Sequence, residues 1–404
     1  MSAIVDLVLG IVTSIGGFVE VGSISTSAQA GADFGFALLW AIGLSGVLLA
    51  MLIEMSGRLA AVSHHTVAGA VRARFGFRFH LIPLTAELLI DILLIAAEIG
   101  GAAIALKLVS GIGFQWWVLP VGGLAWLVLW LSSFSVIEDG FGLLGLVTVS
   151  FVMAAWRLQP PLAVVASGLV PALPGHDVVH YGFLAVSIVG ATISPYLLNF
   201  YASGAVEEKW TESDLWINRA TAFLGIGFGT VVSMGVLVTA ALVLGPRQIR
   251  VDSYEQAALM FVPAFGPWAV TLFALSLGIG CLGAAVEVAL NGGYVLAQAF
   301  GWSWGVEKKR RDTARFCGAF TLMLALALAI GLIGFDPLRM TLISVALIVV
   351  VMPFVVLPFL VLMNDERFVK EHKSGPVGNG VLAVLTILGT ILALVVIPLE
   401  IFGS

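Results

Sequence analysis

The clearest chemistry in the sequence is an acidic residue set among glycines inside a long apolar segment. Glu20 follows Gly16 and Gly17 and precedes Gly22. A charge in such a segment is costly unless it is paired or hydrated, so an acid there is a functional candidate by default. Glycines make a membrane helix easy to interrupt, and the freed carbonyl and amide groups can bind a solute. We expect Glu20 to be a ligand and Gly17 and Gly22 to break the helix; the competing interpretation is a structural acid that accepts hydrogen bonds from the freed amides.

A second interruption is predicted in a later apolar segment, which contains Gly190 and Pro195. Proline lacks the backbone N–H and clashes with the preceding turn, so the carbonyl groups near Ala191 lose their usual donor. The two interrupted segments are the first and the sixth in the chain. Breaks at these positions are typical of a five-plus-five inverted repeat whose substrate site lies between the two broken helices.

Composition assigns the chain to the membrane. It has 404 residues, of which 60% are hydrophobic and 11% charged, and its mean hydropathy is +1.08. A soluble domain has far more charge. Runs long enough to cross about 30 Å of hydrocarbon predict an all-α integral membrane protein with eleven spans, which leave room for only a single transmembrane domain over 1–404. We expect repeats over about 4–156 and 180–363 and an added helix over about 378–401. The expected spans are 4–30, 36–63, 80–107, 115–133, 139–156, 180–204, 218–245, 264–300, 314–334, 339–363 and 378–401.

The basic residues predict the orientation. With the N-terminus in the cytoplasm, fourteen of the 19 Lys and Arg residues fall inside and five outside, as the positive-inside rule requires. The C-terminus is then outside, in a plasma membrane or a bacterial inner membrane. The net charge of -5 and the absence of a continuous basic patch argue against a nucleic-acid partner. Cys281 and Cys317 lie in apolar segments and predict no disulfide framework.

Further acids lie within the spans. Glu87, Asp91 and Glu98 share one face of the third segment because they are spaced by four and seven. This stripe is either a proton or cation path or a structural network. Glu287, in the eighth segment, is a candidate second carboxylate facing the core. Glu54 and Arg58 are four apart, which indicates an ordinary helix ion pair.

Several stretches resemble the Nramp family of divalent-metal transporters, and the resemblance covers essentially the whole chain. It implies a LeuT-type inverted repeat with an eleventh helix. The stretches that carry it are Gln29–Trp40, Arg58–Val62, Ala97–Ala103, Tyr294–Val295 with Gly301–Trp302, and Pro353–Pro358.

The resemblance implies a metal site that departs from the family pattern. The family's D-P-G-N motif falls on Glu20–Ser23, and its M-P-H motif falls on Ser194–Tyr196. The matching ligands are Glu20, Ser23, Ser194 and the carbonyl of Ala191, all of them oxygens, because the thioether is absent. Oxygen ligands suit hard cations such as Mg2+ and Mn2+, so the chain is similar to the Nramp-related magnesium transporters. The metal is expected as substrate, with no cofactor.

Proton coupling is the second departure from the family. The histidine of the family's proton route is replaced by Tyr196, and of its acidic pair, which falls on Ile95 and Glu98, only Glu98 remains. A tyrosine hydroxyl has a reference pKa near 10 and carries protons poorly at neutral pH. The expected proton or cation path retains Glu98, Asp91, Tyr196 and Glu287, and coupling is expected to be weak or absent.

These observations predict a monomeric secondary transporter in the lipid bilayer that carries a divalent cation by alternating access. Two other classes remain open. One is a transporter of the same fold for an organic cation or another small solute, with Glu20 as counter-ion and aromatic residues such as Phe200 lining its cavity. The other is a membrane enzyme or receptor using His176 and His180, whose spacing would place both imidazoles on one helix face.

Overall fold

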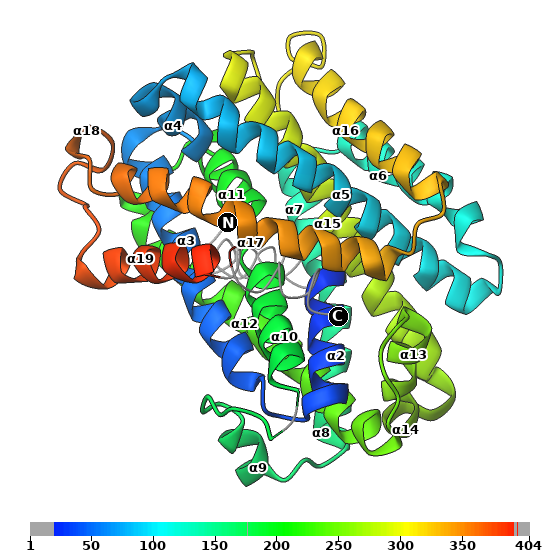
Figure 1. The fold of residues 1–404 in the computed structure, drawn as a ribbon. Helices are drawn as coiled ribbons and strands as arrows, with labels where there is room; N and C mark the ends of the chain where they lie inside the picture. The colour runs from blue at the N-terminus through cyan, green and yellow to red at the C-terminus, as the bar shows by residue number, and fades with distance from the viewer. Residues whose placement is uncertain (1–19, 176, 392–393, 395–404) are drawn as a thin grey trace.

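The computed structural model describes residues 20–175, 177–391 and 394. Throughout these residues every regular element is helical, and the long helices cross one another in a single bundle (Figure 1). The α-helices are α2 (Val21–Phe34), α3 (Leu39–Ser63), α4 (Val67–Phe75), α5 (Phe77–Ser110), α6 (Phe114–Leu131), α7 (Phe134–Gly145), α8 (Val149–Arg157), α9 (Leu162–Ser167), α10 (Val178–Thr192), α11 (Pro195–Glu207), α12 (Leu215–Val243), α13 (Tyr254–Ala258), α14 (Val262–Phe265), α15 (Ala269–Phe300), α16 (Ala314–Leu332), α17 (Pro337–Leu362), α18 (Glu366–Val369) and α19 (Pro376–Ile391). Short 3-10 turns cover Leu146–Thr148, Glu212–Asp214, Gly245–Arg247, Leu259–Phe261 and Gly266–Trp268.

The described residues hold nine helical units long and apolar enough to cross a membrane. They coincide with the second to the tenth of the expected spans, which confirms the membrane class. The first expected span, 4–30, is described only from residue 20 onward, where α2 begins at Val21. Of the eleventh, the structure describes α19, a shorter apolar helix.

The ends of the long helices follow from local sequence. α5 ends at Gly111 and α15 at Gly301, where φ is 73° and 69°, a left-handed conformation that glycine adopts without strain. α4 begins after Thr66, whose hydroxyl accepts a hydrogen bond from the Gly69 N–H at 3.1 Å. These local signals set where α4 begins and where α5 and α15 end.

Small residues let α2 and α3 approach α12 closely. A Cβ placed on Gly31 of α2 would lie 2.3 Å from the carbonyl oxygen of Leu237. On α3, a Cβ on Gly46 would lie 2.1 Å from the Thr230 hydroxyl. Glycine at these contacts allows backbone-to-backbone packing that a larger residue would prevent. α12 therefore supports α2, which also contacts α10 and α17 (Figure 1).

The predicted pair on α3 is confirmed. Arg58 Nη2 lies 3.1 Å from Glu54 Oε2, and Arg219 adds a longer contact of 3.5 Å to the same carboxylate. Asn218 of α12 donates a hydrogen bond to the Glu54 carbonyl at 2.9 Å. This acid is therefore part of the α3–α12 junction and not a transport ligand.

The close approach of α2 to α12 predicts the effect of one methyl group. Gly31→Ala would place its Cβ against the Leu237 carbonyl, and overpacking of this kind costs about 1–3 kcal/mol. We expect a lower thermal unfolding midpoint for the detergent-solubilised protein. Gly123→Ala in α6 is the matched control, since nothing lies within 4 Å of its added Cβ. Equal midpoints for the two variants would show that α2 can shift away from α12 freely.

Candidate functional site

The sixth expected span is interrupted where the sequence predicted. α10 ends at Thr192 and α11 begins at Pro195, with Ile193 and Ser194 in non-helical conformations between them. Pro195 is the first residue of α11, where its missing N–H leaves no helical hydrogen bond unmade within that helix. The same missing N–H leaves the carbonyl of Ala191 without its usual donor four residues later. Ala191 and Ser194 are both buried.

Glu20 lies immediately before the first turn of α2. Its backbone is extended, and its side chain, 2% exposed, does not cap the helix. Oε2 accepts a hydrogen bond from the Tyr196 hydroxyl at 3.5 Å, which is at the long limit for such a bond. Within the described part of the chain Oε1 has no hydrogen-bond partner. The carboxylate therefore keeps acceptor capacity inside the protein.

Gly22 lies where α2 approaches α10. A Cβ at this position would lie 3.3 Å from Glu20 Oε1, 3.4 Å from the Cβ of Ala191 and 3.5 Å from a methyl group of Val345. The sequence placed the break at Gly22; in the structure Gly22 is the second residue of α2, and the helix begins after Glu20. Because Gly22 has no side chain, α2 can approach α10 closely at this position. Gly17, the other expected breaker, lies outside the described residues.

Glu98 supports α2 from the neighbouring helix α5. Its two carboxylate oxygens accept hydrogen bonds from the Val21 N–H at 3.1 and 3.3 Å. A helix N-terminus has unsatisfied N–H groups and favours an anion. The N–H at the start of α2 is therefore bound by Glu98 and not by Glu20.

The remaining predicted residues fall into two groups. Ser23 lies in the first turn of α2 and is buried, and the Ser194 hydroxyl is buried with no hydrogen-bond partner in the described structure. Glu287 of α15 is buried and interacts electrostatically with Glu20. Asp91 is not brought to this group, because it bonds to Asn291 at 3.0 Å, two turns of α5 away from Glu98.

Sequence reasoning missed two buried amides near these acids. Asn199 follows Tyr196 by three residues on α11, and Asn291 follows Glu287 by four on α15. Each spacing places the amide on the same helix face as a predicted site residue. That periodicity was the available signal, since an amide within a membrane span must find a hydrogen-bond partner.

Glu20 is not part of a cluster of strong ligands. No group of three His, Cys, Asp or Glu side chains is assembled to hold a metal ion within the residues that the structure describes. Of the two histidines considered as ligands, His176 lies outside the described residues. His180 Nε2 lies 3.0 Å from Asp33 Oδ2 at the far end of α2.

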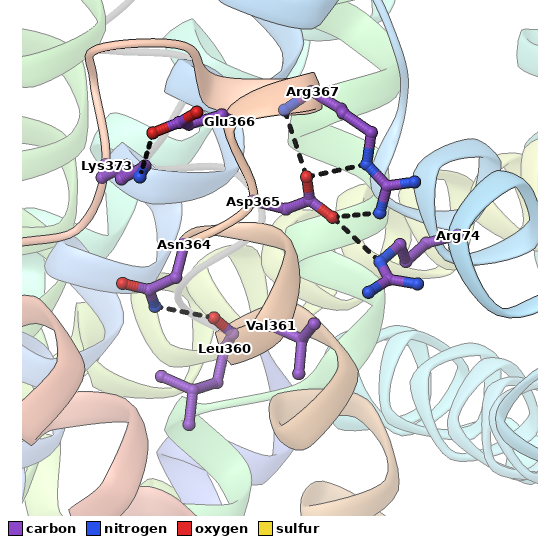
Figure 2. A pocket seen from close by; sticks show the side chains of 8 residues that line it. All are labelled: Arg74, Leu360, Val361, Asn364, Asp365, Glu366, Arg367 and Lys373. Carbon is purple, nitrogen blue, oxygen red and sulfur yellow. Dashed lines mark hydrogen bonds and ion pairs between the residues drawn. The ribbon is translucent and has the colours of Figure 1, made fainter.

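A polar hollow of about 730 Å3 lies elsewhere, at the junction of α4, α17 and α18, and none of the break residues lines it. Figure 2 shows Asp365 at its centre, accepting hydrogen bonds from Arg367 and, at 2.8 Å, from Nε of Arg74. Hydrogen bonds from Arg367 hold the pKa of Asp365 well below its usual range. This network joins α4 to the end of α17.

The arrangement defines a class of membrane transporter. The structure superposes on a manganese transporter from Eremococcus coleocola with a TM-score of 0.78, covering 98% of this chain and 87% of that one at 20% identity. It also matches Mhp1, a nucleobase-cation-symport-1 family transporter, with a TM-score of 0.63, covering 98% of this chain and 91% of that one at 14% identity. The fold is therefore the LeuT-type inverted repeat, as predicted.

Sequence comparison identifies the family. The natural resistance-associated macrophage protein-like family (Nramp) matches residues 10–398, and the chain belongs to this family. The divalent metal cation transporter MntH of Deinococcus radiodurans is 25% identical over 346 residues, which are 81% of this chain and 74% of that protein. MntH of Klebsiella pneumoniae is 29% identical over 351 residues, 82% of this chain and 79% of that protein. These relatives are transporters and not enzymes.

The contact between Glu98 and α2 predicts different effects for two substitutions. Glu98→Ala would leave the buried Val21 N–H without an acceptor, which costs about 1–3 kcal/mol. Glu98→Gln keeps a carbonyl acceptor of similar size. We expect a lower thermal unfolding midpoint for Glu98→Ala than for Glu98→Gln. If both variants unfolded at the same temperature, Glu98 would not be the group that holds the start of α2.

Proposed function

We propose that the protein is a secondary transporter for a hard divalent cation, Mg2+ or Mn2+, working by alternating access. The observation that carries this proposal is the buried carboxylate of Glu20, with a free acceptor oxygen between the interrupted helices. A cation there would neutralise Glu20 and bind the carbonyl of Ala191 and the hydroxyls of Ser23 and Ser194. The printed names of the MntH relatives support a divalent metal as the substrate class.

The ligand chemistry favours hard ions. Ser194 stands where the family resemblance expects a thioether, and thioether ligands favour softer transition metals. Mg2+ commonly binds through one or two carboxylates and keeps several waters, which suits a site built on Glu20. Val345, fully buried beside Gly22, adds no ligand. The ion is a substrate that enters and leaves, so a sparse ligand set is compatible with turnover.

The topology belongs to the same proposal. We place the N-terminus in the cytoplasm and the C-terminus outside, in a plasma membrane or a bacterial inner membrane, with the protein acting as a monomer in the lipid bilayer. The repeats would cover about 4–156 and 180–363. Rocking of the two interrupted helices with their repeat partners against the other helices would open the site to each side in turn.

Transport is proposed to be weakly coupled or uncoupled to protons. Tyr196 hydrogen-bonds Glu20 in the position of the family's histidine, and Glu98 is engaged with the Val21 N–H. Neither group offers a free imidazole or carboxylate for proton exchange. The charge of the ion and its concentration gradient would then supply the driving force.

Calorimetric titration of the purified protein with Mg2+ and Mn2+ tests the site. We expect Glu20→Ala to weaken binding of both ions at least tenfold, about 1.4 kcal/mol, because the carboxylate between α2 and α10 is lost. Glu366→Ala removes an exposed carboxylate on α18 and is the matched control, for which no change is expected. Unaltered ion binding by Glu20→Ala would move the site away from the helix breaks.

Coupling is tested in proteoliposomes that contain a pH-sensitive dye. We expect Mn2+ or Mg2+ uptake, followed with a metal-sensitive dye, with no matching acidification of the lumen. A proton-coupled metal transporter reconstituted in the same way provides the positive control. Acidification that rises with metal uptake and collapses with a protonophore would refute uncoupled transport.

A further inference from the structure

A second polar cluster lies buried between α5, α11 and α15, separate from the helix breaks. Asn199 Nδ2 donates to both oxygens of Glu87 at 2.8 and 2.9 Å. Asn291 Nδ2 bridges the two acids, at 3.0 Å from Glu87 Oε1 and 3.0 Å from Asp91 Oδ2. All four side chains are at least nine-tenths buried. The cluster thus holds two carboxylates within reach of one amide group.

The charge of this cluster is not balanced by the protein. Among residues 20–175, 177–391 and 394, no lysine, arginine or histidine forms an ion pair with Glu87 or Asp91. Two buried carboxylates without a counter-charge are strongly unfavourable in an apolar interior. Something positive must neutralise them, whether it is a proton or a bound cation.

The amide oxygens point to a bound cation. Oδ1 of Asn199 and Oδ1 of Asn291 are both buried and have no hydrogen-bond partner among the residues that the structure describes. An unsatisfied buried acceptor costs about 1–3 kcal/mol. The nitrogen and oxygen of an amide have nearly the same shape, so rotation of each amide by half a turn would aim its oxygen at the carboxylates. Protons on both acids would satisfy these two oxygens separately, whereas a single divalent cation would neutralise both carboxylates and bind both oxygens together.

We propose that Glu87, Asp91, Asn199 and Asn291 form a second binding site for a hard divalent cation. The set contains only carboxylate and amide oxygens, which suit Mg2+ and Mn2+ and leave room for water ligands. Two carboxylates balance the charge of one divalent ion. The inference rests on the proposed function for the identity of the ion.

The cluster lies on helices that also carry residues near Glu20, so it would be the next site that an ion leaving Glu20 reaches. Two members of the cluster share a helix with a residue near the first site. Asp91 precedes Glu98 on α5 by seven residues, or roughly 10 Å, and Asn199 follows Tyr196 on α11 by three residues. Beyond the cluster the polar contacts continue, because Gln298 bonds to Ser203 at 2.9 Å and accepts from Thr66 at 2.8 Å. An ion would therefore move from the oxygen ligands around Glu20 to the oxygen ligands of the second cluster.

Counting Mn2+ ions bound per chain, by calorimetry and by electron paramagnetic resonance of the intact protein, tests this proposal. We expect two ions for the unaltered protein, one for Glu20→Ala and one for the double substitution Glu87→Gln with Asp91→Asn. Because these amides keep the shape of the acids, loss of an ion would not reflect a cavity. Asn291→Asp adds a carboxylate and should tighten the second ion at least tenfold.

The outcomes separate this site from the first. One ion in the unaltered protein, lost in Glu20→Ala and retained in the Glu87–Asp91 double variant, would overturn the second site and leave the proposed function intact. An ion lost only in the double variant would support the second site and overturn the role of Glu20. A destabilised Asn291→Asp with no tighter binding would mark the cluster as a hydrogen-bond network only, and would overturn the proposal.

Discussion

The proposed site depends on the carboxylate of Glu20, which is buried without a full set of hydrogen-bond partners among the described residues. Glu20 lies where α2 begins, and the favourable position for an anion at that helix end is taken by Glu98, which binds the Val21 N–H. Within the described part of the chain, Glu20 accepts one long hydrogen bond from Tyr196, and its Oε1 has no hydrogen-bond partner. A group in this state gains from a cation more than a paired acid would, because its desolvation is uncompensated until the ion arrives.

The supporting helices hold this arrangement through small residues and not through strong bonds. Gly22 permits Ala191 and Glu20 to approach, and Gly31 permits α2 to lie against the backbone of α12. In a membrane, packing of this kind replaces the hydrophobic driving force between helices. Such contacts also suit an element that must move, since van der Waals contact between smooth helix faces resists sliding less than a network of ion pairs does.

The sequence predicted what depends on composition and local chemistry. Hydropathy located the spans. Pro195 identified the interruption of the sixth span, because the missing N–H of a proline removes a hydrogen bond within its own span. It did not predict which acid would serve α2, since Glu98 is 77 residues from Val21 and their contact is decided by packing. Gly22 was expected to interrupt a helix, whereas it is the second residue of α2, which begins at Val21. Asn199 and Asn291 were overlooked because amides carry no charge and so do not stand out in an apolar run.

The role of Glu98 also bears on the coupling of transport. Glu98 accepts hydrogen bonds from the first backbone N–H of α2, and these bonds hold the start of that helix. Protonation of Glu98 would weaken its hydrogen bonds with the Val21 N–H and disturb the start of α2. Glu20 lies at that start, so its position for binding the ion would change as well. Proton exchange at Glu98 and ion binding at Glu20 would therefore compete. Tyr196, in the position of the family's histidine, carries no imidazole that could exchange the proton instead. If Glu98 serves only to hold the start of α2, the proposed transport would run without the proton as a driving ion.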